Sequence, residues 1–184
     1  MNAPARFFIT VLMGVTLTAT TLAAPIAQLP DAQTRLIDDI ITRLEISKDV
    51  AWTKFRSHLP VVNPQREAVI MKGLISQGEK IGLTRNEVTS FFRPQVFASC
   101  LLQEEMIEAW KAGILQPKNP PKDLQKEIRP RMVAISLKML VDLKALPPSS
   151  FKNSFRQEAD QRIQAMGFTK KVASTASSPL VNPR

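Results

Sequence analysis

A small set of basic and hydrogen-bonding side chains is spaced so that it could surround one anionic ligand. Arg43 and Lys54 lie 11 residues apart, which is about three turns of an α-helix. Both therefore project from one helix face, roughly 16 Å apart along its axis. Two long side chains at that separation can converge on a ligand between them. Arg66 follows the Asn63-Pro64 pair, where the free amides of a starting helix also favour an anion.

Three further residues extend this set in other segments. Ser99 and Gln103 are four residues apart and share one helix face, and Arg129 lies in the segment after that. Together these groups can clamp and polarise a molecule that carries carboxylates. Any one of them alone is more typical of a solvated surface residue. The inference of a site therefore depends on the joint pattern.

Other catalytic chemistries find little support. His58 is the sole histidine and Cys100 the sole cysteine, which argues against a zinc site, a Ser-His-Asp triad and an intramolecular disulfide. Ser99-Cys100 could suggest a nucleophile, but Ser99 has no base partner and a lone cysteine is most often a small buried hydrophobe. We therefore expect no metal, no cofactor and no covalent intermediate.

The formal charge of +9, from 25 Lys and Arg against 16 Asp and Glu, favours anionic partners without saying which. Lys and Arg are dispersed among acidic residues, and no basic-aromatic motif is present. Trp52, Trp110 and the Phe91-Phe92 pair are predicted to lie in the core. We expect a small-molecule ligand, no nucleic-acid partner and no stable membrane anchor.

Apolar residues recur at helical spacing, and no strand alternation or repeat is found. Start signals are a cap at Asn63, a capping box from Thr84 to Glu87, and a cap at Asp123. Prolines should kink or split the third helix at Pro94 and disturb the fourth at Pro130. The fold class is all-α, a single helical-bundle domain of about five or six helices, with helices expected near residues 31–57, 64–81, 84–112, 123–145 and 150–166.

The chain divides into three parts. Residues 1–24 read as a signal peptide, with Arg6, an apolar stretch and small residues for cleavage near Ala23. The mature protein is then exported, to the periplasm or the medium. Residues 25–167 form the helical domain. Residues 168–184, rich in Ser, Thr, Ala and Pro, are predicted to be a flexible C-terminal tail.

The ordered set of residues resembles the helical chorismate mutases. The segment from Arg43 to Lys54 resembles the first active-site helix of that family, and Arg66-Glu67 resembles the pair that opens the next one. The segment 91–96 with Ser99 and Gln103 resembles the substrate-facing helix. Ile128-Arg129-Pro130 is similar to the Arg-Pro element of the exported gamma class. The resemblance covers about residues 31–143 and implies a chorismate mutase type II-like bundle.

This resemblance implies an isomerase that converts chorismate to prephenate by an intramolecular Claisen rearrangement in a basic, metal-free pocket. It needs no cofactor, proton transfer or nucleophile. On the family pattern, the catalytic residues are Lys54, Gln103 and Arg66. Lys54 and Gln103 would donate to the ether oxygen, whose charge grows at the transition state, and Arg66 would complete the positive wall.

The remaining implied contacts hold the substrate. Arg43 and Arg129 would grip its carboxylates, since arginine forks suit that geometry. Ser99 would contact a carboxylate and Glu67 the ring hydroxyl. The resemblance also implies that subunits pair into a homodimer. An alternative is a catalytically silent exported helical module that uses the same scaffold to bind a partner.

The chain leaves the family pattern at three points. Asn63 stands where some relatives have Asp, which keeps the helix-capping role. Cys100 stands where relatives often carry a charged residue. The gamma class often contains a disulfide, and a chain with one cysteine cannot form one internally. These differences bear on efficiency and stability more than on the type of reaction.

Overall fold

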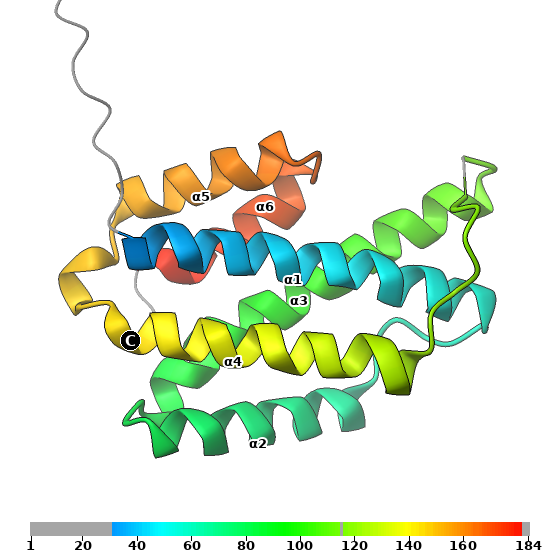
Figure 1. Cartoon of the computed structure of the whole chain (residues 1–184). Coiled ribbons are helices and arrows are strands. Elements are labelled where there is room, and N and C mark those ends of the chain that lie inside the picture. Colours follow the sequence, from blue (N-terminus) through cyan, green and yellow to red (C-terminus); the bar gives the residue numbers. More distant parts are fainter. Residues whose placement is uncertain (1–30, 115, 182–184) are drawn as a thin grey trace, which may run out of the picture.

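The computed structural model describes residues 31–114 and 116–181, and within those ranges the chain is helical with no strand (Figure 1). This confirms the predicted all-α class. The six α-helices are α1 (Asp31–Arg56), α2 (Pro64–Lys80), α3 (Arg85–Lys111), α4 (Arg129–Ala145), α5 (Asn153–Ala165) and α6 (Lys170–Ser177).

The predicted start signals are the ones the helices use. Asn63 Oδ1 accepts a hydrogen bond from the Arg66 amide at 2.8 Å and caps α2. Thr84 and Glu87 form the reciprocal capping box at the start of α3. Asp123 caps the next helical segment by accepting from two backbone amides, at 2.7 and 2.8 Å. Each bond satisfies an amide that the helix itself leaves free.

The two predicted proline effects have different outcomes. α3 is one continuous helix with Pro94 inside it, because the fully buried Phe91 and Phe92 hold that stretch against the core. The start of α4 is disturbed as expected. A π-helical turn, Leu124–Ile128, precedes Arg129, and Pro130 sits in the first turn of α4, where its missing N–H is not needed.

Helix α1 lies at the centre of the arrangement. It contacts α3 and α4 over much of its length and α5 near its start, while α2 packs on α3 and α4. α2 and α4 run in the same direction, and α1 runs opposite to both (Figure 1). The main core fills the space between α1, α3, α5 and α6 and continues against the second half of α4 and Leu74 of α2. It includes Leu36, Ile40 and Phe155, all 0% exposed. α1 and α3 therefore have a second long face, turned toward α2 and α4.

The aromatic residues that were predicted to lie in the core are buried. Phe91 and Phe92 are fully buried in the main core, and Trp52 and Trp110 pack with Phe55 in a smaller cluster at the far end of α1. Trp52 Nε1 donates to the carbonyl of Asn119 at 2.9 Å, which fastens the loop before α4 to α1. None of these rings forms an exposed stacking surface.

The prediction of a flexible tail from residue 168 is wrong for the residues that the structure describes. Residues 170–177 form α6, a 3₁₀ turn Ser178–Leu180 follows, and Gly167 ends α5 with a positive φ of 86°. Val172, Ala173 and Ala176 are 0% exposed in the main core. Small apolar residues allow two helices to pack closely. The same residue types are common in flexible linkers, which is why the sequence suggested a tail. The helical domain therefore continues past 167, to at least residue 181.

The predicted signal peptide, residues 1–24, lies outside the described residues, as do residues 182–184. Among the helices that are described, none has the length and apolar character that a membrane span requires.

Candidate active site

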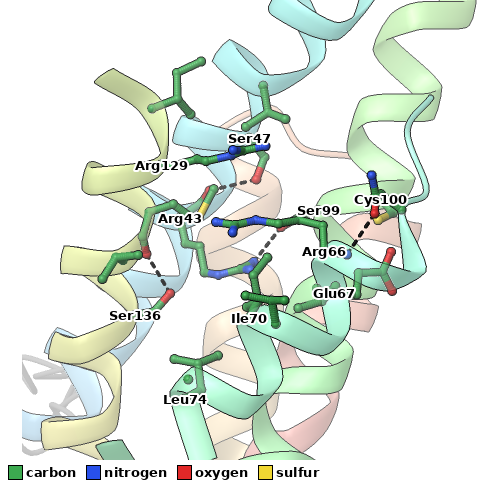
Figure 2. Close-up of a pocket in the computed structure, with 18 of the residues that line it drawn as sticks. Arg43, Ser47, Arg66, Glu67, Ile70, Leu74, Ser99, Cys100, Arg129 and Ser136 are labelled. Atoms are coloured by element: carbon green, nitrogen blue, oxygen red, sulfur yellow. Dashed lines mark hydrogen bonds between the residues drawn. The ribbon is translucent and has the colours of Figure 1, made fainter. Parts of the chain in front are cut away.

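All seven side chains predicted to form the site line a single cavity of about 410 Å³ between α1, α2, α3 and α4 (Figure 2). A cavity of this size suits a small metabolite. The seven residues come from segments up to 86 positions apart, and they are Arg43, Lys54, Arg66, Glu67, Ser99, Gln103 and Arg129.

One face of α1 supplies the floor of the cavity. Arg43, Ser47, Val50 and Lys54 all line it, at the spacing that brings residues of an α-helix onto one face. Leu36 and Ile40, seven and three residues before Arg43, continue the same side of α1 into the main core. Packing of these apolar residues therefore fixes the direction in which Arg43 and Lys54 point.

Arg43 is buried and is held from α3. Its Nη1 donates to Ser99 Oγ at 2.6 Å and to the backbone carbonyl of Gln95 at 2.7 Å. Its Nε is buried and has no hydrogen-bond partner. Burial lowers the pKa of Arg43 to about 10, because a guanidinium removed from water loses hydration that two neutral acceptors replace only in part. The Arg43 guanidinium is therefore held in a fixed orientation by neutral acceptors, and no carboxylate neutralises its charge.

Lys54 is half-buried, and its Nζ donates to the carbonyl of Val61 at 2.6 Å. That bond ties the segment between α1 and α2 to the cavity and aims the ammonium group. Burial lowers the pKa of Lys54, and the nearby Glu67 opposes this shift in part. Cys100 lies beside them, and burial followed by the charge of Glu67 raises the pKa of its thiol. The thiol therefore stays neutral, and we assign it no nucleophilic role.

Two helix starts converge at the same end of the cavity. Arg66 is in the first turn of α2 and Arg129 opens α4, so both positive helix ends and both guanidinium groups face this region. Burial lowers the pKa of Arg129, and the neighbouring charge of Arg66 lowers it further. Like charges this close indicate a place for an anion that would relieve their repulsion.

Gln103 is 5% exposed, and its Oε1 has no hydrogen-bond partner. Ser99, one turn earlier on α3, is also buried and donates to the carbonyl of Gln95 at 3.0 Å. The amide oxygen of Gln103 and the Nε of Arg43 therefore both lack a hydrogen-bond partner in the same cavity. A polar ligand could supply these partners.

The cavity has a strong charge imbalance. It is lined by four cations, Arg43, Lys54, Arg66 and Arg129, and by one carboxylate, Glu67. Within the described ranges none of the four forms an ion pair with a carboxylate, although eight such pairs occur elsewhere. These same ranges contain no group of three or more His, Cys, Asp or Glu that could hold a metal ion. The cavity can bind a compact dianion and donate hydrogen bonds to the middle of that ligand.

Sequence reasoning missed two hydroxyl groups in the cavity wall. Ser47 and Ser136 line it from α1 and α4, each donating to the carbonyl four residues earlier, Arg43 and Met132 (Figure 2). Helical spacing could have found them, because Ser47 lies one turn from Arg43, and Ser136 two turns from Arg129. With their protons engaged, both offer acceptor lone pairs to a ligand.

The sequence matches the family model for chorismate mutase type II over residues 28–105. This stretch contains α1, α2 and most of α3, and hence every residue of the predicted set except Arg129. Among proteins with curated descriptions, none matches this sequence at a significant level.

Solved structures extend the likeness to the whole bundle. The chorismate mutase from Burkholderia thailandensis is 22% identical with a TM-score of 0.73, and the match covers 82% of this chain and 99% of that one. The chorismate mutase from Burkholderia phymatum is 21% identical with a TM-score of 0.73, and the match covers 82% of this chain and 96% of that one. The secreted chorismate mutase from Yersinia pestis is 22% identical with a TM-score of 0.68, and the match covers 83% of this chain and 96% of that one. At these identities the likeness shows a shared fold.

Proposed function

We propose that this chain is a chorismate mutase of type II, an isomerase that converts chorismate to prephenate in the basic cavity, on the premise of its match to that family's model over residues 28–105. The observation that carries the proposal is the convergence of all seven expected side chains on one cavity from four helices. The alternative of a catalytically silent binding module does not account for four cations without ion pairs that line the cavity beside the unpaired Arg43 Nε and Gln103 Oε1.

The first task of the cavity is to hold the substrate in its reactive conformer. Arg43 and Arg129 each offer a fork of N–H donors to a carboxylate, and Arg66 adds charge between them. Arg43 is already oriented by Ser99 and by the Gln95 carbonyl, so little side-chain freedom is lost on binding. Holding two carboxylates at a fixed distance favours the compact chair over the extended forms that predominate in water.

The second task is to stabilise charge at the ether oxygen. As the C–O bond breaks and the new C–C bond forms within the same molecule, negative charge grows on that oxygen. Lys54 has three donors and uses one on Val61, so two remain for the substrate. Gln103 would supply a neutral N–H from the other side. Preorganised donors of this kind are worth about 3 kcal/mol each.

The third task is recognition of the remaining polar groups. Ser99 would support a substrate carboxylate through the Arg43 fork, to which it is bonded. Glu67 is the one carboxylate that lines the cavity, and it would accept the ring hydroxyl. No step transfers a proton to or from the protein, so these residues position the substrate without changing their own charge.

Turnover of chorismate by the purified protein tests the proposal directly, by the loss of its absorbance. Lys54→Ala should lower kcat/KM by at least about 100-fold while circular dichroism stays unchanged, because the lost donor acts on the transition state. Lys72→Ala is the matched control, since Lys72 is exposed on α2 and does not line the cavity. Absent turnover in the folded wild-type protein, or a Lys54→Ala variant as active as Lys72→Ala, would reject the mutase assignment.

Export is part of the same proposal. The N-terminal 24 residues have the pattern of a cleavable signal, and one structural neighbour is described as a secreted enzyme. Mass spectrometry of the protein from the periplasm and the medium would locate the new N-terminus, expected near Ala24. Pairing into a homodimer also stays a prediction, which light scattering of the mature protein would test.

A further inference from the structure

Helix α4 is preceded by a turn that is wider than an α-helical turn. The amide of Arg129 donates to the carbonyl of Leu124, five residues earlier, which is the π-helical pattern. Such a turn holds one residue more than the α-helical turn it replaces, so each later residue is rotated by about 100° around the axis. The direction in which Arg129 leaves the helix therefore depends on the π turn Leu124–Ile128.

One carboxylate on α1 is bonded to both ends of this π turn. Asp49 Oδ2 accepts from Lys122 Nζ at 2.7 Å, and Lys122 lies two residues before the turn. The same oxygen accepts from Arg131 Nη1 at 3.0 Å, and Arg131 lies three residues after it. We call this pair of contacts the Asp49 bridge. It joins the segment that enters the π turn to the helix that leaves it.

Two neighbouring contacts hold the same stretch against α1. Thr53 Oγ1, one turn after Asp49, donates to the carbonyl of Lys122 at 2.9 Å. Ile128 is 0% exposed and belongs to a small apolar cluster with Ile46, which lies one turn before Asp49. These three residues of α1 follow one another at helical spacing. One strip of α1 therefore supports the π turn along its whole length.

The two arginines at the start of α4 have different surroundings. Arg129 lines the cavity, and no ion pair with a carboxylate is found for it within the described ranges. Arg131 does not line the cavity and is paired with Asp49. Residues two apart on an α-helix point in nearly opposite directions. Holding Arg131 against α1 therefore fixes the rotation of α4 that turns Arg129 toward the cavity.

We propose that Asp49 is a positioning residue for the active site, because its bridge across the π turn sets the direction in which α4 presents Arg129 to a substrate carboxylate. The inference rests on the proposed mutase function, in which Arg129 grips that carboxylate. Asp49 does not line the cavity, so it acts only through α4. Without the bridge, Arg129 would spend less time in the binding orientation. The effect should therefore fall on KM more than on kcat.

Steady-state kinetics of Asp49→Ala test this role. KM for chorismate should rise by about ten-fold, and kcat should change by less than about three-fold. Asp38→Ala is the matched control, because Asp38 is also on α1, is paired with Arg162 of α5 and does not line the cavity. Both variants lose a carboxylate from a partly exposed ion pair, so urea unfolding should change little in either. An equal KM in the two variants would overturn the proposal.

The sign of the change separates positioning from simple charge. Asp49→Ala removes a negative charge near a cavity for a dianion, so electrostatic attraction alone would lower KM. Loss of positioning raises it. Arg131→Met breaks the bridge from the other side and should raise KM to a similar extent. A fall in KM for Asp49→Ala with a rise for Arg131→Met would show a charge effect and would reject the bridge.

A double-mutant cycle tests the route through Arg129. In an Arg129→Ala background there is no guanidinium left to orient, so adding Asp49→Ala should change KM by less than about two-fold. The same ten-fold rise in that background would show that Asp49 acts on another part of the cavity, and the proposal would be wrong.

Amide hydrogen exchange followed by mass spectrometry tests the bridge without turnover. Asp49→Ala should speed exchange in peptides covering residues 124–129 by at least about ten-fold, and Asp38→Ala should not. A wild-type protein that consumes no chorismate but shows this difference would keep the bridge and lose the mutase function. If chorismate is consumed while the two variants agree in exchange and in KM, the mutase function stands and the bridge is rejected.

Discussion

The two long faces of α1 and α3 differ in whether their buried polar groups have hydrogen-bond partners. On the side of α5 and α6, buried polar groups are few and paired, as where Gln95 Nε2 donates to the Ala176 carbonyl at 2.6 Å. On the side of α2 and α4, Arg43 Nε and Gln103 Oε1 are buried without partners. The first face provides stability. The second keeps polar groups ready for a ligand, and that readiness costs stability.

Phe155 provides the largest test of the stabilising face. It is 0% exposed on α5, at the centre of the main core, so Phe155→Ala should lower the free energy of unfolding by about 4 kcal/mol. Urea denaturation followed by circular dichroism measures this. KM for chorismate should be unchanged under conditions where the variant is folded. A loss below about 1 kcal/mol would mean that α5 and α6 do not hold the fold.

Arg43→Met tests the opposite face. It removes a carboxylate clamp and should lower kcat/KM by about 100-fold or more, near 3 kcal/mol. Stability should stay equal or rise, because the buried guanidinium lacks a counter-charge and has a pKa lowered to about 10. The Gln95 carbonyl keeps the Ser99 hydroxyl as a donor, so no acceptor is orphaned. Paired urea and kinetic measurements suffice, and a large destabilisation would contradict the comparison.

Gln95 lies between the two faces and makes them separable. Its side chain bonds to α6, while its backbone carbonyl accepts from Arg43. Gln95→Ala should cost about 2 kcal/mol of stability, because it leaves the buried Ala176 carbonyl without that donor. Activity should fall by less than about three-fold, since the backbone contact to Arg43 remains. A much larger loss of kcat would show that α6 also positions the cavity.

The pH dependence should give the smallest effect near neutrality. Gln103 does not titrate and always offers a donor, so kcat/KM should be nearly constant between about pH 6 and 8. Burial lowers the pKa of Lys54 below its ordinary value of 10.5, so activity should be lost as pH rises through that lowered pKa. A rate that collapses between about pH 6 and 8 while circular dichroism persists would contradict this assignment.

The stability contribution of Arg43 should change with pH in the opposite sense. Burial lowers its folded pKa to about 10, below the ordinary pKa of a guanidinium. Between the lowered and the ordinary pKa the unfolded chain binds more protons, so this group adds stability as pH rises. Titration of Arg43 should therefore not unfold the protein on the alkaline side, where activity is lost. Parallel kinetic and unfolding curves for wild-type protein and Arg43→Met would separate the two.

Much of this molecule was readable from its sequence because the signals are local. Caps at Asn63, Thr84 and Asp123 act within three or four residues, and so they predicted the helix starts closely. The spacing of Arg43 and Lys54 predicted a shared face for the same reason. A split of α3 at Pro94 does not occur, because core packing of α3 outweighs the lost hydrogen bond.

Tertiary structure alone decided two features. Residues 170–177 are too short and too rich in small residues to form a stable helix in isolation, and only burial of Val172 and Ala176 against the rest of the core makes them α6. The cavity depends on how α2 and α4 bring Arg66 and Arg129 up to α1 and α3, which no spacing along one helix can reveal. The sequence determined which helices form and which side chains they present. How closely those helices pack, and so where space is left, was decided by contacts between residues far apart in the chain.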